Sequence, residues 1–159
     1  MTTSTNPTTI EADPAVPLVR IVREFDAPVA RVFRAHVELA LFEQWNGPAD
    51  TRMRAEHFDC RTGGSYRYAM TREGFETWFR GSFHEVRENE LIVQTFTWEG
   101  MPDGVALERL TFEDLGGGRT RLVATSLVDS FAARDAFVAS GMESGVVQGY
   151  AKLDTILGG

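Results

Sequence analysis

Six segments with strand-like patterns follow one another between residues 52 and 128, and they limit the possible folds more than any other feature of the sequence. We place them at roughly 52–60, 64–72, 75–87, 91–98, 106–114 and 119–128. Turn signals such as Gly63-Gly64 and Gly116-Gly117-Gly118 separate them. Because parallel neighbours would need long crossover connections, this close spacing predicts an antiparallel sheet.

Helical patterns lie before and after these strands. A first strand at residues 18–25 leads into two short helices, which end at Gly47-Pro48. Near the C-terminus, Ser140 and Glu143 have the spacing of a capping box, and an apolar stripe at helical spacing follows them. The pattern therefore predicts a long C-terminal helix, preceded by a shorter one at about 131–139. The predicted fold class is α+β, with a curved antiparallel sheet of about seven strands.

We expect one domain over residues 18–159. A chain of 159 residues with 43% hydrophobic side chains has enough apolar material for a single core. Residues 1–17 are rich in Thr and Pro and have little to bury, so they are expected to form a flexible tail.

Alternation along the strands predicts which side chains face the inside of the sheet. At residues 119–124 the two arginines share one face, which assigns the opposite face to the interior. The strand at 91–98 has apolar groups on both faces, so its orientation stays open. With the stripe of the C-terminal helix, this test gives the residues expected to line an apolar ligand cavity: Tyr66, Tyr68, Met70, Phe79, Phe83, Gln94, Phe96, Glu108, Leu110, Phe112, Met142, Val146 and Tyr150.

Three polar residues, His57, Gln94 and Glu108, also have inner parity. A mostly apolar pocket with a few polar groups is typical of small-molecule sites. A histidine oriented by a carboxylate is a plausible general base, so His57 and Glu108 are the candidate catalytic pair. The alternative is structural: each of the three is solvated near a strand end or is satisfied by a backbone group.

Several classes of function are disfavoured. A net charge of -7 opposes binding to nucleic acid, and no run approaches the roughly 18 apolar residues of a membrane span. Three dispersed histidines, one cysteine and the lack of a nucleotide-binding glycine motif predict no metal and no cofactor. The lone Cys60 and an N-terminus without secretory features predict a cytoplasmic location, and the lack of an apolar run predicts a soluble protein. We expect a monomer or a homodimer.

Three segments carry a resemblance to a known family: residues 41–48 (LFEQWNGP), 58–67 (FDCRTGGSYR) and 141–145 (GMESG), the last with Leu153 and Leu157. They resemble the bacterial homologues of the activator of the heat shock protein 90 ATPase, within the START-like superfamily. The resemblance covers about residues 18–157 and implies a helix-grip fold with a hydrophobic cavity between the sheet and the C-terminal helix. Val146 stands where that family frequently has Trp, so the pocket is expected to be larger or differently shaped.

These observations leave three functions open, in order of preference. The first is binding of a small hydrophobic or aromatic molecule in the cavity. The second is an enzyme of the polyketide cyclase or hydrolase kind, which would act on a bound substrate through cavity acids and bases. The third is a co-chaperone-like interaction module, ranked last because such a protein is expected to carry a further N-terminal domain that residues 1–17 cannot replace.

Overall fold

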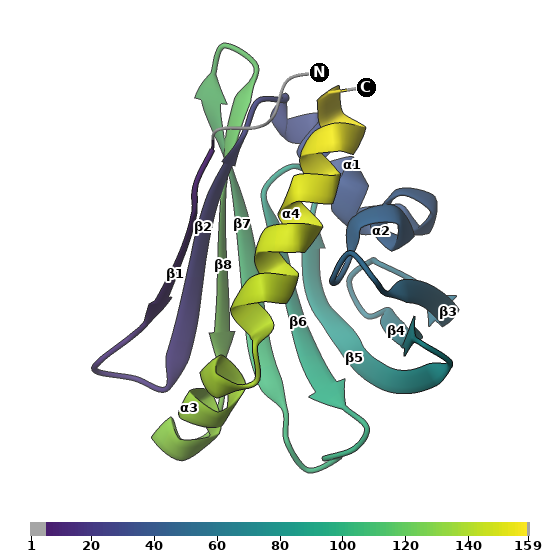
Figure 1. The fold of residues 1–159 in the computed structure, drawn as a ribbon. Helices are drawn as coiled ribbons and strands as arrows, with labels where there is room; N and C mark the ends of the chain where they lie inside the picture. Colours follow the sequence, from purple (N-terminus) through teal and green to yellow (C-terminus); the bar gives the residue numbers. More distant parts are fainter. Residues whose placement is uncertain (1–5, 159) are drawn as a thin grey trace.

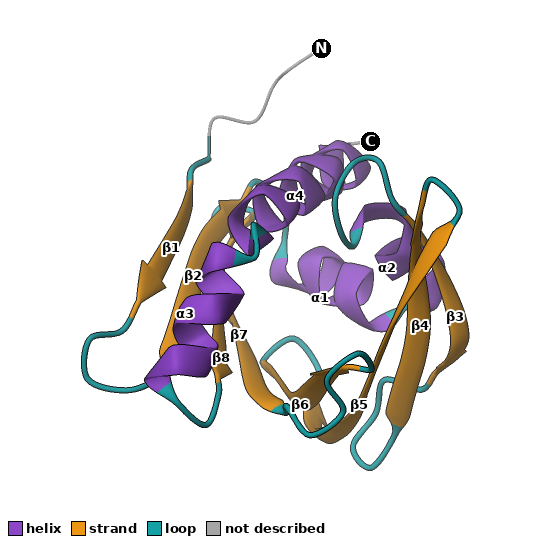
Figure 2. Ribbon diagram, turned by 60° about the horizontal axis from the view of Figure 1, so that its bottom comes forward, coloured by secondary structure: helices purple, strands orange, loops and turns teal. Residues whose placement is uncertain are grey.

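A strongly curved antiparallel sheet holds the C-terminal helix α4 (Met142–Gly158) against its concave face (Figure 1). The computed structural model describes residues 6–158. In this range the sheet has eight strands in the order β1-β2-β8-β7-β6-β5-β4-β3. In Figure 2 the strands form an open arc, with α1 (Val29–Val37) and α2 (Leu39–Trp45) on its inner side. The helix-grip architecture expected from the sequence is confirmed.

The strand boundaries agree closely with the sequence pattern. The strands are β1 (Thr8–Ala12), β2 (Leu18–Phe25), β3 (Arg52–Phe58), β4 (Ser65–Arg72), β5 (Phe75–Arg87), β6 (Leu91–Trp98), β7 (Ala106–Gly116) and β8 (Arg119–Leu127). Each of the six predicted central strands is present, and successive strands from β3 to β8 pair as antiparallel neighbours. The prediction succeeded because hairpin spacing leaves little choice of partner.

The expected count of about seven strands and the expected flexible tail are both corrected by β1. Residues Thr8–Ala12 pair residue for residue with Val19–Arg23 of β2, and so form the edge of the sheet. Only the backbone is needed for this ladder, so a segment with few apolar side chains can still be ordered. Residues 1–5 of the predicted tail lie outside the described residues.

Helix α3 (Phe131–Ala139) fixes the connection between β1 and β2. The buried guanidinium of Arg134 donates from Nη1 to the carbonyl oxygen of Asp13 at 2.7 Å and to that of Leu18 at 3.2 Å. A charged donor that satisfies two backbone acceptors compensates for its own burial. The edge of the sheet and the helix before α4 therefore form one packed unit.

Helix α4 is anchored to the inner face of the sheet by apolar packing and one ion pair. Tyr150, Leu153 and Leu157 are buried in the core. The buried Arg23 of β2 forms a bidentate pair with Asp154 of α4. Because Arg23 lies on the concave face, this pair joins the C-terminal half of α4 to the sheet.

The start of α4 differs from the predicted capping box. Ser140 has a helical backbone and is the C-terminal cap of α3, and its hydroxyl donates to the carbonyl oxygen of Phe137 at 2.5 Å. Gly141 then adopts a φ of +88°, which is the usual way for a helix to end. The capping box is therefore wrong: Ser140 ends one helix and does not cap the next.

Two glycines let α4 approach the loop that follows α2. A Cβ atom on Gly145 would lie 3.3 Å from Cγ of Pro48, and one on Gly149 would lie 3.1 Å from the carbonyl oxygen of Trp45. Side chains at these positions would push the helix away from residues 45–48.

Among residues 6–158 no helix is long and apolar enough to cross a membrane.

Candidate functional site

A cavity of about 680 Å³ lies between α4 and the concave face of the sheet. Most of its lining is aromatic or aliphatic, and the rings pack on one another. Phe79 and Phe96 are stacked with centroids 5.1 Å apart, and Tyr66 and Tyr68 are stacked at 5.8 Å. Because each ring packs against its neighbours, the wall of the cavity is rigid, and the cavity persists in the folded protein.

Nearly all the residues predicted to line a cavity do so. The structure places these expected residues in the lining: Tyr66, Tyr68, Phe79, Phe83, Gln94, Phe96, Glu108, Leu110, Met142, Val146 and Tyr150. Met70 and Phe112 are the exceptions. Met70 packs against the core with its methyl group beside Gly47, and Phe112 is buried against the rings of Phe33 and His36. Both pack on the hydrophobic core as their inner parity predicts, but neither lines the cavity.

A row of three polar side chains crosses the sheet inside the cavity. Gln94 of β6, Glu108 of β7 and Ser126 of β8 are direct partners in register. Nε2 of Gln94 donates to Oε1 of Glu108 at 3.0 Å, and the Ser126 side chain also hydrogen bonds to this carboxyl group. Neighbouring strands thus place two hydrogen-bonding partners on one half-buried acid.

Burial changes the acidity of Glu108. Its removal from water raises the pKa to about 7 from 4.5, although the hydrogen bonds from Gln94 and Ser126 act in the opposite direction. Desolvation outweighs the two bonds because neither neutral partner supplies a positive charge. Near neutral pH this carboxyl group can therefore give up or accept a proton inside the cavity.

His57 does not reach the cavity, so the predicted His57 and Glu108 pair is wrong. His57 is exposed and its Nε2 lies 3.0 Å from the hydroxyl of Ser65. The register of β3 against β4 shifts between Ala55 and His57. A bulge of one residue moves every later side chain to the opposite face, so the alternation counted from the sequence assigned His57 to the wrong side.

Tyr66 is held in the wall of the cavity by a glycine on the next strand. Its hydroxyl donates to the carbonyl oxygen of Thr95 at 2.6 Å, and this bond crosses over β5. A Cβ on Gly81 would lie 2.0 Å from that same oxygen and 2.6 Å from the Tyr66 hydroxyl. Gly81 therefore provides the space in which the ring and its hydrogen bond fit.

His36 contributes an uncharged ring to the lining. It is buried between Trp45 and Phe112, and its Nδ1 lies 2.8 Å from the carbonyl oxygen of Val32. Burial lowers the pKa of His36 to about 4, so the ring is neutral at ordinary pH. His36 therefore acts as a core residue, consistent with its place on the apolar stripe of α1.

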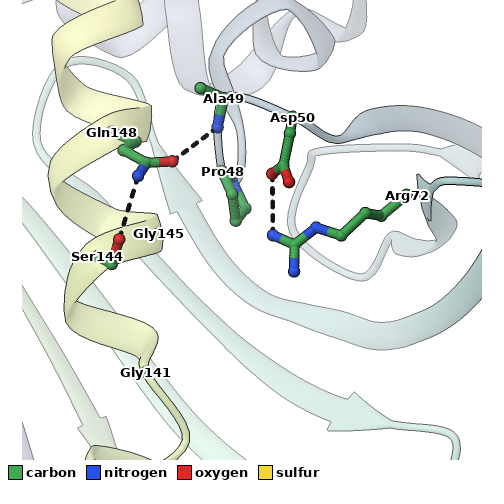
Figure 3. Close-up of a pocket in the computed structure, with 8 residues that line it drawn as sticks. All are labelled: Pro48, Ala49, Asp50, Arg72, Gly141, Ser144, Gly145 and Gln148. Atoms are coloured by element: carbon green, nitrogen blue, oxygen red, sulfur yellow. Dashed lines mark hydrogen bonds and ion pairs between the residues drawn. The ribbon is translucent and has the colours of Figure 1, made fainter.

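An outer hollow of about 430 Å³ adjoins the cavity at the N-terminal end of α4 (Figure 3). The loop at residues 46–51 is tied to both sides of this hollow, and Figure 3 shows the two contacts, which start from Ala49 and Asp50. The backbone N–H of Ala49 donates to Gln148 of α4 at 2.9 Å, and Asp50 pairs with Arg72 of β4 at 3.0 Å. Pro48 of this loop and Gly145 of α4 line both hollows, so the loop lies at the boundary between the cavity and the outer hollow.

Several lining residues were not among those expected. They include Ile21, His36, Phe42, Trp45, Phe58, Ile92, Trp98, Ser126 and Phe137. Ser126 could have been found, because it continues the inner alternation of Leu122 and Ala124 along β8. Phe42 and Phe137 could not, since their direction depends on how α2 and α3 pack against the sheet.

Within residues 6–158 no group of three or more His, Cys, Asp or Glu side chains is arranged to hold a metal ion.

The chain is similar to a known protein family and to several solved structures. A family model described as Activator of Hsp90 ATPase homolog 1-like protein matches residues 26–158. No curated protein matches the chain. A crystal structure of a Rhodobacter sphaeroides protein has a TM-score of 0.87 at 24% identity, covering 96% of this chain and 99% of that one. Protein Ms6760 from Mycobacterium smegmatis has a TM-score of 0.85 at 23% identity, covering 95% and 97%. At these identities the likeness establishes the fold alone.

Proposed function

Because this chain belongs to the family of Activator of Hsp90 ATPase homolog 1-like proteins, we propose that it binds a small hydrophobic or aromatic molecule in the cavity between α4 and the sheet. The observation that carries the proposal is the cavity of about 680 Å³ with its ring-lined wall and the polar row of Gln94, Glu108 and Ser126. Ligand pockets of small molecules have volumes of about 300–1,000 Å³ and combine apolar walls with a few polar groups.

The polar row is a second reason for a ligand. A half-buried acid with only neutral partners is an unfavourable feature of a core that serves packing alone. Gln94, Glu108 and Ser126 lie side by side on three strands, so they present donors and acceptors at one place in the cavity. Such an arrangement orients a bound molecule, whose apolar part would contact Phe79 and Phe96.

A titration with the neutral aromatic dye N-phenyl-1-naphthylamine tests the proposal. We expect saturable binding of one dye per chain with an increase in its fluorescence, because the dye leaves water for an apolar site. Native mass spectrometry of the protein as purified should also find a bound molecule. The absence of saturable binding, together with the absence of any co-purified molecule, would contradict the proposal.

A matched pair of variants on β5 locates the dye. Phe79 lines the cavity, whereas Phe75 on the same strand is 79% exposed. Phe79→Leu should weaken dye binding by roughly tenfold, which corresponds to about 1.4 kcal/mol of lost ring contact. Phe75→Leu should leave binding unchanged. Equal effects of the two substitutions would place the dye on the outer surface.

A second candidate function, acid–base catalysis on a bound substrate, is favoured by Glu108 alone. A carboxyl group whose pKa is raised to about 7 is suited to proton transfer near neutral pH. If turnover of a substrate is found, Glu108→Gln should abolish it, while the neutral dye N-phenyl-1-naphthylamine should still bind. A cytoplasmic location and a monomeric or homodimeric state are also part of our proposal, and light scattering after size-exclusion chromatography checks the latter.

A further inference from the structure

Among the described residues that line the cavity, few side chains carry a charge at ordinary pH, and only one of them is an acid. Among the lining residues, Glu108 is the sole acid and Arg72 is the sole permanently charged base. Arg72 lies toward the outer hollow, where it is paired with Asp50 (Figure 3). Glu108 therefore sets the electrostatic character of the inner cavity.

The other titratable groups around Glu108 are neutral at ordinary pH. Burial lowers the pKa of His36 on α1 to about 4, and burial raises the pKa values of Tyr66 and Tyr68 on β4 and of Tyr150 on α4. Strands β6 and β8 contribute the uncharged Gln94 and Ser126 beside the carboxyl group. Arg23 of β2 is paired with Asp154. None of these described side chains is a free cation for Glu108.

The ionised carboxylate of Glu108 thus lacks a counter-ion. A carboxylate has about four acceptor positions, and the two neutral donors leave some of them open. An opposite charge stabilises a buried ion far more than a neutral hydrogen bond does. A ligand that carries a positive charge would therefore provide the missing counter-ion of Glu108.

The rings near the polar row also favour a cation. Phe83 is the register partner of Gln94 on β5, and the Tyr66 ring lies 5.2 Å from that of Phe83. Aromatic faces attract ammonium groups, and several rings around one acid form a typical environment for an amine. An anionic ligand would instead meet the carboxylate of Glu108 and find no unpaired cation in the described lining.

From the lone carboxyl group of Glu108, its neutral neighbours and the surrounding rings, we infer that the cavity selects a lipophilic amine. The aromatic or aliphatic body of this ligand fills the space between α4 and the sheet, and its protonated nitrogen binds Glu108. This inference rests on the proposed function, because it names the ligand class of the same cavity.

Three naphthyl probes that differ in one group test the inference: 2-(2-naphthyl)ethylamine, 2-(2-naphthyl)ethanol and 2-naphthylacetate. At pH 8 the amine should bind at least about tenfold more tightly than the alcohol, and the carboxylate should bind most weakly. Between pH 5.5 and 8 the affinity for the amine should rise steeply below about pH 7 and level off above it, because Glu108 must lose its proton to pair with the ammonium group. The affinity for the alcohol should change little.

Two variants of β7 assign the preference to one carboxyl group. Glu108→Gln should remove the preference for the amine and its pH dependence, while the alcohol binds within about threefold of its affinity for the wild type. Glu113→Gln removes the same charge from the exposed outer face of β7 and should behave as the wild type. If Glu113→Gln also removes the preference, the preference arises from net charge, and the assignment to Glu108 is overturned.

The possible failures can be told apart. Saturable binding of the alcohol with equal or weaker binding of the amine at pH 8 overturns the inference and leaves the proposed function standing. No saturable binding of any of the three probes overturns both.

Discussion

At the scale of single residues, Glu108 is the position at which function and stability are in conflict. The side chain occupies an inner site on β7 that any apolar residue could fill, yet it carries a carboxyl group whose pKa burial raises to about 7. A group that binds its proton more tightly in the folded state stabilises that state only while it is protonated. Near neutral pH the protein therefore retains an acid that lowers its own stability.

The substitution Glu108→Gln should reveal this conflict. The stabilising effect of the raised pKa is fully present below about pH 4.5 and is lost as the pH rises through about 7. The variant should therefore gain stability relative to the wild type between pH 5 and pH 8.5, by up to about 3 kcal/mol at about 1.4 kcal/mol per tenfold change in proton affinity. Chemical denaturation across this range measures the difference.

The control for this prediction is Glu113→Gln, since Glu113 is exposed on the opposite face of β7. Its stability relative to the wild type should not follow the same trend with pH. The neutral His36 loses stabilisation as the pH falls toward about 4, but it does so in every variant and cancels in the difference. If the stability difference between Glu108→Gln and the wild type does not change between pH 5 and pH 8.5, the pKa of Glu108 is not raised in the folded protein.

Gly81 provides a second prediction at this scale. An added methyl group would lie 2.0 Å from the carbonyl oxygen of Thr95 and would displace the Tyr66 hydroxyl. Gly81→Ala should therefore lower the free energy of unfolding by at least about 2 kcal/mol through overpacking. Gly104→Ala is the control, because its methyl group would be 3.4 Å from the nearest described atom. Similar thermal midpoints for both variants would mean that β5 and β6 separate at little cost.

Residue-scale predictions from the sequence succeeded where the alternation was unbroken and failed where it was not. Glu108 and Gln94 face the cavity because β6 and β7 keep a regular register through these positions. His57 was misplaced by a register shift of β3 that no residue in its neighbourhood signals clearly. Packing details, such as the absence of Met70 and Phe112 from the cavity lining, depend on distant elements and are not encoded in local spacing.

At the scale of elements, β1 is the part of the fold that sequence reasoning missed. Only Ile10 in this strand is strongly apolar, so no burial pattern indicates a strand. Its order comes from five backbone partners on β2 and from the fixing of the following loop by Arg134. β1 pairs with backbone groups of β2 that would otherwise form an open edge of the sheet.

A protein that begins at Asp13, after an added initiator Met, tests the role of β1. It lacks the strand but keeps the carbonyl acceptor of Arg134. We expect a lower thermal midpoint and increased self-association at high concentration, because the free edge of β2 can pair with another chain. A protein that begins at Asn6 keeps all described residues and should match the full chain. Identical midpoints and light scattering for both truncations would contradict the role assigned to β1.

At the scale of the whole molecule, the sequence predicted the architecture but not the size of the cavity. Strand spacing and the amphipathic stripe of α4 are local patterns, and they suffice for a sheet that curves around a helix. The cavity is the volume left after α1, α2, α3 and the loop at residues 46–51 have packed. Its size depends on how closely all these elements pack, which local sequence patterns do not encode. Val146 is the one residue at which a resemblance to relatives suggested extra space, and it does line the cavity.

The substitution Val146→Trp tests whether this space is a binding site. The larger ring would enter a cavity of about 680 Å³ and contact atoms that now face empty volume, so the free energy of unfolding should hold or rise. The affinity for N-phenyl-1-naphthylamine should fall at least about tenfold because the ring occupies its space. Val147→Trp on the exposed side of α4 is the control and should change neither quantity. If Val146→Trp instead lowers stability by roughly 1–3 kcal/mol and leaves dye binding intact, the core beside α4 is tightly packed and the ligand lies elsewhere.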